Sequence, residues 1–395
     1  MKTLVVVAAG AADRPVDELG GRTPLEAAAT PVLDRIARDG RIGRLVPAPS
    51  GRDPGDGAFA LALFGLDPVS YGDAGATLEA AALDVPVETR DQVLRLALVS
   101  ADDRAIYDAT AGGMLRDEAA LMLESLRGSF SPEDMTFHAG HGARHVLVWK
   151  GARELRVETT SPFDALGEKL KKVMPRGNGA KKLAALIETS RDVFAKHDVN
   201  ELRAELGEKP ATMAWPWGSG ISVPLPDFTT RTGLDAFAIG VDPCFLGAAR
   251  LQGIETHTPK GATGRPGSNL RAKADAALKA LDDHDIVFLH VDALAAAAHE
   301  GDFVAKVETI EKLDGYVLGL LARAIERGLE SRLVIIGGPG VSSETGRMLT
   351  EPVPFALAGS GIRAHRKARF TEAGARDAGF QVDAAHELLP YLLQH

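Results

Sequence analysis

At 395 residues the chain is long enough for one large or two ordinary domains with a sizeable core. Its 45% apolar and 25% charged residues are typical of a soluble globular protein, and its net charge of −9 argues against nucleic acid or an anionic membrane as a partner. The single cysteine, Cys244, excludes an internal disulfide and indicates a cytoplasmic location. No run reaches the roughly 18 apolar residues that a membrane span needs.

The first forty residues predict one strand and two helix starts. Val5, Val6 and Val7 are typical of a buried strand, so the apolar run at 4–12 is interpreted as a strand and its exit, not as a signal peptide. The sequence Thr-Pro-Leu-Glu at 23–26 is a capping box with proline in the first turn. Thr-Pro at 30–31 predicts a second helix, which Gly40 ends.

The middle of the chain has a different pattern from its two ends. We expect a helix at 118–126 and an amphipathic helix at 183–196, among strand-like segments at 93–99, 106–107, 135–138 and 146–150. This mixture predicts a smaller α+β domain at 85–180, inserted into a core domain formed by 1–84 and 181–395.

The C-terminal part alternates strands with helices. Strands are predicted at 237–241, 286–290 and 333–336, with an edge strand at 353–358, and helices are predicted up to 252, at 270–281 and at 303–327. Such alternation predicts an α/β fold whose mostly parallel sheet is covered by helices on both faces.

The stretch at 287–302 is the most informative part of the sequence. Its apolar strand ends in His290, Val291 and Asp292, and open α/β sheets place their chemistry at the carboxyl ends of such strands. Four consecutive alanines at 295–298 then occupy a predicted loop where polar groups would be expected.

Several short motifs occur in a fixed order along the chain: GAADRP at 10–15, GLDP at 65–68, WPWGSG at 215–220, GATG at 261–264, HEGD at 299–302 and EPVPF at 351–355. In these motifs the chain resembles the archaeal-type cofactor-independent (2,3-bisphosphoglycerate-independent) phosphoglycerate mutases of the alkaline-phosphatase superfamily. The resemblance implies an alkaline-phosphatase-like α/β core domain that carries an inserted transferase-like domain.

The resemblance also implies two divalent ions, Mn, Mg or Zn, and a serine nucleophile. Asp56 stands at the nucleophile position, and only His299 is retained among the expected metal ligands. The other ligand positions carry side chains that do not bind dications: Ala9, Gly57, Ala295, Gly337, Gly338 and Met348. We therefore expect metal binding to be lost, although Asp292, Glu344 or Glu351 could substitute as ligands.

Few substrate contacts of the family are retained. Its arginine, histidine and lysine positions correspond to Gly75, Gly113 and Leu246. The part that survives is Arg144 with His145, and an arginine in a cleft could grip phosphate or carboxylate, or it could be an ordinary surface residue.

Two carboxylates and one imidazole complete the candidate set. Asp56 could act as a replacement nucleophile, or it could cap a helix that begins near Ala58. His299 is a candidate acid or base, and Asp302 is a candidate substrate contact.

Three hypotheses follow for the function. The first is a pseudoenzyme that keeps the scaffold for binding, regulation or assembly, with a small anionic metabolite or a protein as partner. The second is a repurposed, metal-independent enzyme that acts on a small anionic or phosphorylated metabolite. The third is residual interconversion of 2- and 3-phosphoglycerate. Whether the chain is an enzyme, and its oligomeric state, stay open at this stage.

Overall fold

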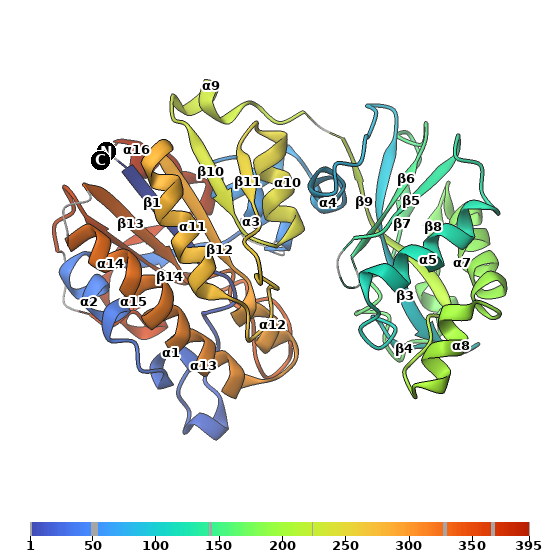
Figure 1. Ribbon diagram of the computed structural model, residues 1–395, viewed down its shortest axis with the longest axis horizontal. Coiled ribbons are helices and arrows are strands. Elements are labelled where there is room, and N and C mark those ends of the chain that lie inside the picture. The colour runs from blue at the N-terminus through green and yellow to red at the C-terminus, as the bar shows by residue number, and fades with distance from the viewer. Residues whose placement is uncertain are drawn as a thin grey trace. The chain divides into compact units, whose positions relative to one another are not determined.

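The computed structural model describes residues 2–48, 54–140, 142, 144–222, 224–326, 330–364 and 368–394. The chain forms two compact units, the first from Met1–Ser70 with Leu225–His395 and the second from Tyr71–Pro224 (Figure 1). The second unit therefore starts before, and ends well after, the predicted insertion at 85–180. The limits of this unit differ from the predicted ones because the helix after residue 180 and the strand that carries WPWGSG pack with the core and sheet of the second unit.

The first unit is built on an eight-stranded sheet. Its strands, in spatial order, are β11 (Glu255–His257), β10 (Ala236–Ile239), β12 (Ile286–Val291), β1 (Lys2–Ala8), β13 (Ser331–Ile336), β14 (Val353–Gly359), β2 (Arg41–Leu45) and β15 (Gln381–Val382). All pairings are parallel except the two of β14. The mostly parallel sheet is confirmed. The prediction of an edge strand at 353–358 was wrong, because β2 and β15 extend the sheet beyond β14.

Helices connect these strands: α1 (Pro24–Ala27), α2 (Pro31–Asp39), α3 (Asp56–Leu63), α9 (Phe228–Thr232), α10 (Pro243–Leu251), α11 (Leu270–Asp283), α12 (Ala293–His299), α13 (Phe303–Lys312), α14 (Gly319–Glu326), α15 (Glu372–Ala378) and α16 (Leu388–Gln394). Short 3-10 turns lie at Asp17–Leu19, Pro68–Ser70 and Ala385–Glu387. The capping box of α1 is confirmed, since Thr23 and Glu26 exchange hydrogen bonds. Every helix in the described part of the chain is too short or too polar to cross a bilayer.

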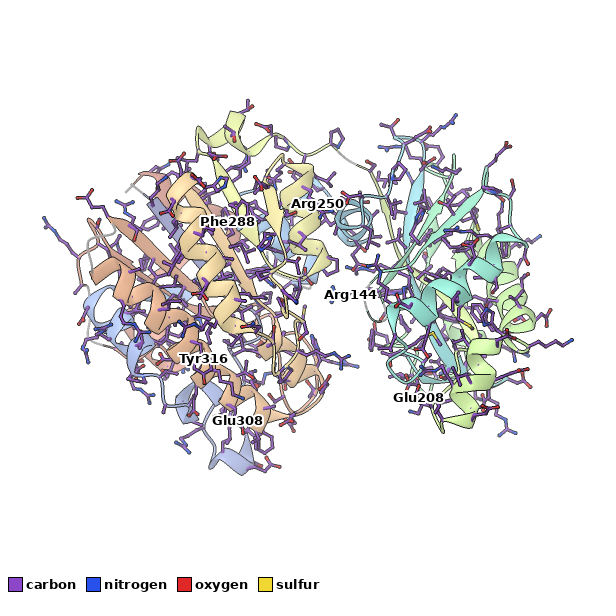
Figure 2. The ribbon with its side chains drawn as sticks, in the orientation of Figure 1. Arg144, Glu208, Arg250, Phe288, Glu308 and Tyr316 are labelled. Atoms are coloured by element: carbon purple, nitrogen blue, oxygen red, sulfur yellow. The ribbon has the colours of Figure 1, made fainter. Side chains whose placement is uncertain are left out.

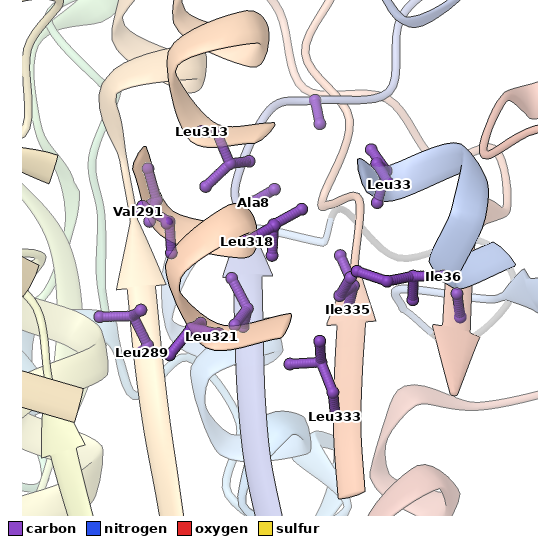
Figure 3. Close-up of a cluster of buried hydrophobic side chains, with 14 of the residues drawn as sticks. Ala8, Leu33, Ile36, Leu289, Val291, Leu313, Leu318, Leu321, Leu333 and Ile335 are labelled. Atoms are coloured by element: carbon purple, nitrogen blue, oxygen red, sulfur yellow. The ribbon is translucent and has the colours of Figure 1, made fainter. Parts of the chain in front are cut away.

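Alternating side chains of β12 serve the two faces of the sheet. Phe288 (Figure 2) packs edge-on against Phe64 and Phe228, at ring-centroid distances of 4.8 and 6.1 Å. His290, two residues further, stacks on Phe245 of α10 at 4.9 Å. On the opposite face, Leu289 packs with side chains of the neighbouring strands, of α2 and of the helical stretch at 313–321. Figure 3 shows the strand residues Ala8, Leu289, Val291, Leu333 and Ile335 beside the helix residues Leu33, Ile36, Leu313, Leu318 and Leu321. Helices therefore cover both faces, as predicted.

The predicted long helix after residue 303 contains a π-helical stretch, Leu313–Leu318, between α13 and α14. Asp314 in this stretch is buried, and its two carboxylate oxygens accept the backbone N–H groups of Val32 (3.2 Å) and Leu33 (2.7 Å). Thr30 makes no side-chain cap to α2, so a carboxylate distant in sequence satisfies the first turn instead.

The second unit combines helices with antiparallel strands. The main sheet consists of β4 (Ile106–Asp108), β3 (Gln92–Ala101), β6 (His145–Trp149) and β5 (Met135–His138), and β9 (Met213–Ile221) also pairs with β3. A small ribbon joins β7 (Val157–Glu158) to β8 (Arg176–Gly177). Its helices are α4 (Gly75–Ala82), α5 (Arg116–Arg127), α6 (Leu170–Val173), α7 (Ala180–Phe194) and α8 (Asp198–Glu205).

Candidate functional site

The segments expected to carry the chemistry of the first unit meet at the carboxyl ends of β1, β12 and β13. Backbone hydrogen bonds join them directly: the Ala9 N–H donates to the Val291 carbonyl at 3.0 Å, and the Gly10 N–H donates to the Pro339 carbonyl at 2.8 Å. These segments, which the sequence placed at one edge of the sheet, therefore do lie together. The expected ligand positions Ala9, Ala295, Gly337 and Gly338 all lie on these segments.

The exit of β1 packs against α12 without intervening space. A Cβ placed on Gly10 would lie 2.4 Å from the Cα of Ala295, which is closer than real contacts allow. The prediction of a loop at 295–298 was wrong, because these alanines belong to α12. Alanine has the highest helix propensity and no side chain that obstructs close packing, so the helix fills the space.

The end of β13 is equally closed. A Cβ on Gly338 would lie 2.5 Å from Cγ1 of Val353, and a Cβ on Gly337 would lie 3.0 Å from Cγ of Pro354. A side chain at either glycine would therefore require Val353 or Pro354 of β14 to shift.

These positions also fail as a donor set for a pair of divalent ions. Divalent ions bind side-chain oxygen, nitrogen or sulfur donors, and the alanines and glycines provide none. Gly57 lies in α3, and Met348 forms an isolated bridge with Val341. Among the described residues, no three His, Cys, Asp or Glu side chains converge in a way that could hold a metal ion. The residues present do not fit the family's metal centre.

His299, the one retained ligand, ends α12 and is exposed. Its Nδ1 lies 2.7 Å from the carbonyl oxygen of Gly346. Because a carbonyl only accepts, this contact assigns the proton to Nδ1 and leaves Nε2 as the basic nitrogen. The ring is thus oriented for acid–base chemistry or for a single contact to a ligand.

A buried charged cluster lies at the end of β12. Lys273, on α11, donates from Nζ to the carbonyl of His290 (2.6 Å) and to Oδ2 of Asp292 (3.3 Å). The other carboxylate oxygen, Oδ1, lies 2.6 Å from Nδ1 of His290. This short contact pairs the imidazole with the carboxylate.

The cluster fixes the charge of its members. Burial lowers the pKa of His290, but the neighbouring Asp292 carboxylate outweighs burial and raises the pKa above its ordinary value. Burial raises the pKa of Asp292, and the His290 and Lys273 cations outweigh it, so that pKa is lowered. Asp292 is therefore charged and paired with Lys273 and His290, and its role as a substitute metal ligand stays a prediction.

The other carboxylate candidates have structural partners or lie outside the description. Asp302 caps α13, since its Oδ1 accepts the Ala305 N–H at 2.8 Å. Glu351 forms an exposed ion pair with Arg14 at 2.6 Å. Glu344 is exposed, and its pairing as a ligand stays a prediction.

Asp56 begins α3, and its side chain lies outside the described residues. The helix begins at Asp56 with Gly55 as its N-cap residue, and the predicted capping role of the Asp56 side chain also lies outside the described residues. Its role as a nucleophile stays a prediction.

Arg144 and His145 belong to the second unit. The Arg144 side chain is 38% exposed, and its Nη1 lies 3.8 Å from Oε1 of Glu79 (Figure 2 labels Arg144). His145 begins β6, is buried, and accepts the Gly140 N–H at Nδ1 (3.2 Å). Burial lowers the pKa of His145 to about 4, so the ring is neutral near pH 7 and packs within the core.

Comparison with known proteins places the chain in a family. A model of the family described as 2,3-bisphosphoglycerate-independent phosphoglycerate mutase matches residues 37–200. A protein of that name from Methanothrix thermoacetophila is 34% identical over 394 residues, which cover 100% of both chains. The chain belongs to the 2,3-bisphosphoglycerate-independent phosphoglycerate mutase family. Another member, from Thermococcus kodakarensis, is 31% identical and covers 99% of this chain and 96% of its own.

Solved structures agree on the fold of this mutase-family chain. A protein from Pyrococcus horikoshii superposes with a TM-score of 0.80 at 25% identity, covering 100% of this chain and 96% of its own. A cofactor-independent phosphoglycerate mutase from Thermoplasma acidophilum gives a TM-score of 0.62 at 21% identity, over 100% of both chains. At that identity the second likeness shows the fold alone.

Sequence reasoning missed several charged residues of this mutase-family chain. Lys273 was one of them, although a signal existed: it occupies the apolar face of α11 beside buried Leu270, Ala274 and Ala277. A lysine on a buried face needs a partner, so its position indicates an internal ion pair. Lys306 on α13 is a second case, since it is fully buried against Asp13 at 2.7 Å.

Proposed function

We propose that this chain is a phosphoglycerate-mutase-like pseudoenzyme, which binds a small anionic metabolite or a protein partner and does not catalyse metal-dependent phosphoryl transfer. The observation that carries the proposal is the contact between Gly10 and Ala295 at the carboxyl end of β1. This close approach supports the proposal, because it leaves no room for a side chain at Gly10 and dications require side-chain donors. A cytoplasmic location stays a prediction.

The chemistry of phosphoryl transfer supports this proposal. Transfer through a carboxylate such as Asp56 would still require cations to neutralise the charge of the phosphoryl group. The side chains found at the expected ligand positions provide no such neutralisation, and His299 alone cannot bind two ions.

Binding of an anion is supported by arginines in the second unit. Arg95 donates from Nε to Oε1 of buried Glu79 at 2.8 Å and lies over the ring of Trp217, with its Cζ 4.9 Å from a ring centroid. Arg144 shares Glu79, and its guanidinium stays accessible to solvent. Orienting a guanidinium beforehand reduces the entropy lost when it binds a phosphate or carboxylate.

A coupled mutase assay with added Mn²⁺ or Mg²⁺, paired with metal analysis of the purified protein, tests the proposal. We expect no turnover above background and no stoichiometric metal. A matched pair of variants, His299→Ala and the exposed Asp17→Ala, should behave alike in the assay. Metal-dependent turnover that His299→Ala abolishes would overturn the proposal.

A second candidate function is the interconversion of 2- and 3-phosphoglycerate itself. The observation that favours it is the 34% identity over the full length of a relative bearing the mutase name. In the same assay this function predicts turnover with metal that ceases in EDTA. Turnover that persists in EDTA and requires His299 would instead identify a metal-independent enzyme.

A further inference from the structure

A cavity lined by several charged side chains lies in the first unit, on the β14 and β2 side of the sheet edge. Its volume is about 400 Å³, within the usual size of a small-molecule site. The walls come from the segment after β1, α1, β2, the connection from β13 to β14, and α15. Neither the expected metal positions nor Arg144 lines it.

The carboxylates of this cavity have partners within the protein. Asp13 accepts hydrogen bonds from the buried Lys306 ammonium (2.7 Å) and the Ser343 hydroxyl (2.6 Å). Glu351 pairs with Arg14 at 2.6 Å. These two carboxylates are therefore neutralised by cations that hold them in place.

The remaining two carboxylates are held around Thr23. Glu372 accepts the Thr23 hydroxyl at 2.7 Å and the Asp13 N–H at 2.9 Å, whereas Glu26 accepts the Thr23 N–H at 3.0 Å. Burial, the largest effect, raises the pKa of Glu372, and Glu26 raises it further. Glu372 therefore contributes less negative charge than an exposed carboxylate at the same pH.

Unlike these carboxylates, two arginines of the cavity lack an ion-pair partner among the described residues. Arg44, on β2, has its Nε buried without a hydrogen-bond acceptor in the described part of the chain. Arg376, on α15, makes no ion pair with any described residue. Their elements are neighbours, since α15 packs against β2.

We propose that this cavity binds a small hydroxylated oxyanion, whose phosphate or carboxylate group is held by the guanidinium groups of Arg44 and Arg376. Both arginines line the cavity, and neither forms an ion pair with a described residue, so an oxyanion could bind their guanidinium groups through charge-assisted hydrogen bonds. The Glu26 and Glu372 oxygens can accept hydrogen bonds from hydroxyl groups of the same ligand. The assignment does not depend on whether the chain is a mutase.

Calorimetric titration of the full chain with inorganic phosphate, glycerol 3-phosphate and glycerate tests this site. We expect at least one probe to bind with a Kd of about 1 mM or tighter. Comparison of the second and third probes distinguishes a phosphate monoester from a carboxylate. Absence of binding for all three would overturn the assignment.

Variants locate the site. Arg44→Gln and Arg376→Gln should each weaken binding about tenfold, as expected for the loss of one charge-assisted hydrogen bond. Arg376 is exposed, so its variant should fold even if Arg44→Gln does not. Arg271→Gln, at an exposed arginine of α11, is the matched control and should bind like the wild type. Binding that Arg376→Gln leaves unchanged would overturn the role of that arginine and the site.

The outcome is distinguishable from that of the proposed function. Mutase turnover unaffected by Arg44→Gln and Arg376→Gln would refute the pseudoenzyme proposal and leave this site standing. If phosphate binds equally to the wild type and to both variants, the proposed site is refuted and the pseudoenzyme proposal stands.

Discussion

Single residues of the first unit show how buried charge is tolerated in this chain. Lys306 is fully buried, and burial lowers its pKa while the Asp13 carboxylate raises it in part. Its Nζ also donates to the carbonyl of Val341 at 2.9 Å. The ammonium is therefore stable only because it keeps its partners, and removing one of them leaves a buried charge uncompensated.

We expect Asp13→Ala to destabilise the protein by about 3–5 kcal/mol, because the Lys306 ammonium would lose its counter-ion. Urea unfolding monitored by circular dichroism measures this difference. Adding Lys306→Met to the variant should recover much of the loss, whereas Asp17→Ala, at an exposed position, should change stability by less than about 0.5 kcal/mol. An Asp13→Ala protein as stable as the wild type would contradict the ion-pair argument.

His145 makes the stability of the chain depend on pH. Burial holds its folded-state pKa at about 4, below the ordinary value of 6.5, so the unfolded chain binds the proton first as pH falls. Stability is thus fully present above pH 6.5 and is lost between pH 6.5 and 4, by about 3 kcal/mol. Protonation of Nδ1 would also break its hydrogen bond from Gly140.

His145→Asn is the matched variant for this measurement. The Asn side-chain oxygen can accept the Gly140 N–H but does not titrate. Between pH 7 and pH 4, the unfolding free energy of the wild type should therefore fall by about 3 kcal/mol more than that of the variant. Equal pH dependence in both proteins would show that another group is responsible.

At the scale of elements, the close packing of the β1 exit against α12 determines how little space the candidate site contains. Gly10 has a φ of +81° and faces Ala295. The α12 helix fits because its residues facing β1 are small. A helix of larger residues could not approach the strand so closely. The close packing therefore requires both the small side chains of α12 and the glycine at position 10.

Gly10→Ala and Gly20→Ala form a matched pair that tests this packing. Both glycines have a positive φ, +81° and +69°, but a Cβ at Gly20 meets no atom within 4 Å. Gly20→Ala should cost about 1–2 kcal/mol for the left-handed conformation alone. Gly10→Ala should cost at least about 2 kcal/mol more, because overpacking is added. Thermal unfolding of the two variants makes the comparison, and equal losses would contradict the close approach.

At the scale of the whole molecule, each unit has its own core. In the second unit, Leu183, Leu186 and Phe194 of α7 pack with side chains of β3, and β9 pairs with β3 along most of its length. Both α7 and the strand that carries WPWGSG are therefore structural parts of the second unit.

Two fragments test these limits. We expect residues 71–224 to unfold cooperatively in urea, because they retain the sheet and the core of the unit. Residues 85–180 should not, since they lack β9 and nearly all of α7 and thus expose one edge of β3 and its apolar face. Cooperative unfolding of the shorter fragment would restore the predicted domain boundaries.

The amino-acid sequence by itself determined the helix and strand pattern of most of the chain, the mostly parallel sheet and the family, because apolar periodicity, capping residues and ordered motifs are local properties. It also placed Ala9, Ala295, Gly337 and Gly338 on segments that meet at one edge of the sheet. Tertiary structure alone decided that α12 fills that edge, that β14 lies inside the sheet, and that Lys273 and Lys306 have buried partners. These features depend on contacts between residues far apart in the sequence, and such contacts leave only indirect signals in a local pattern.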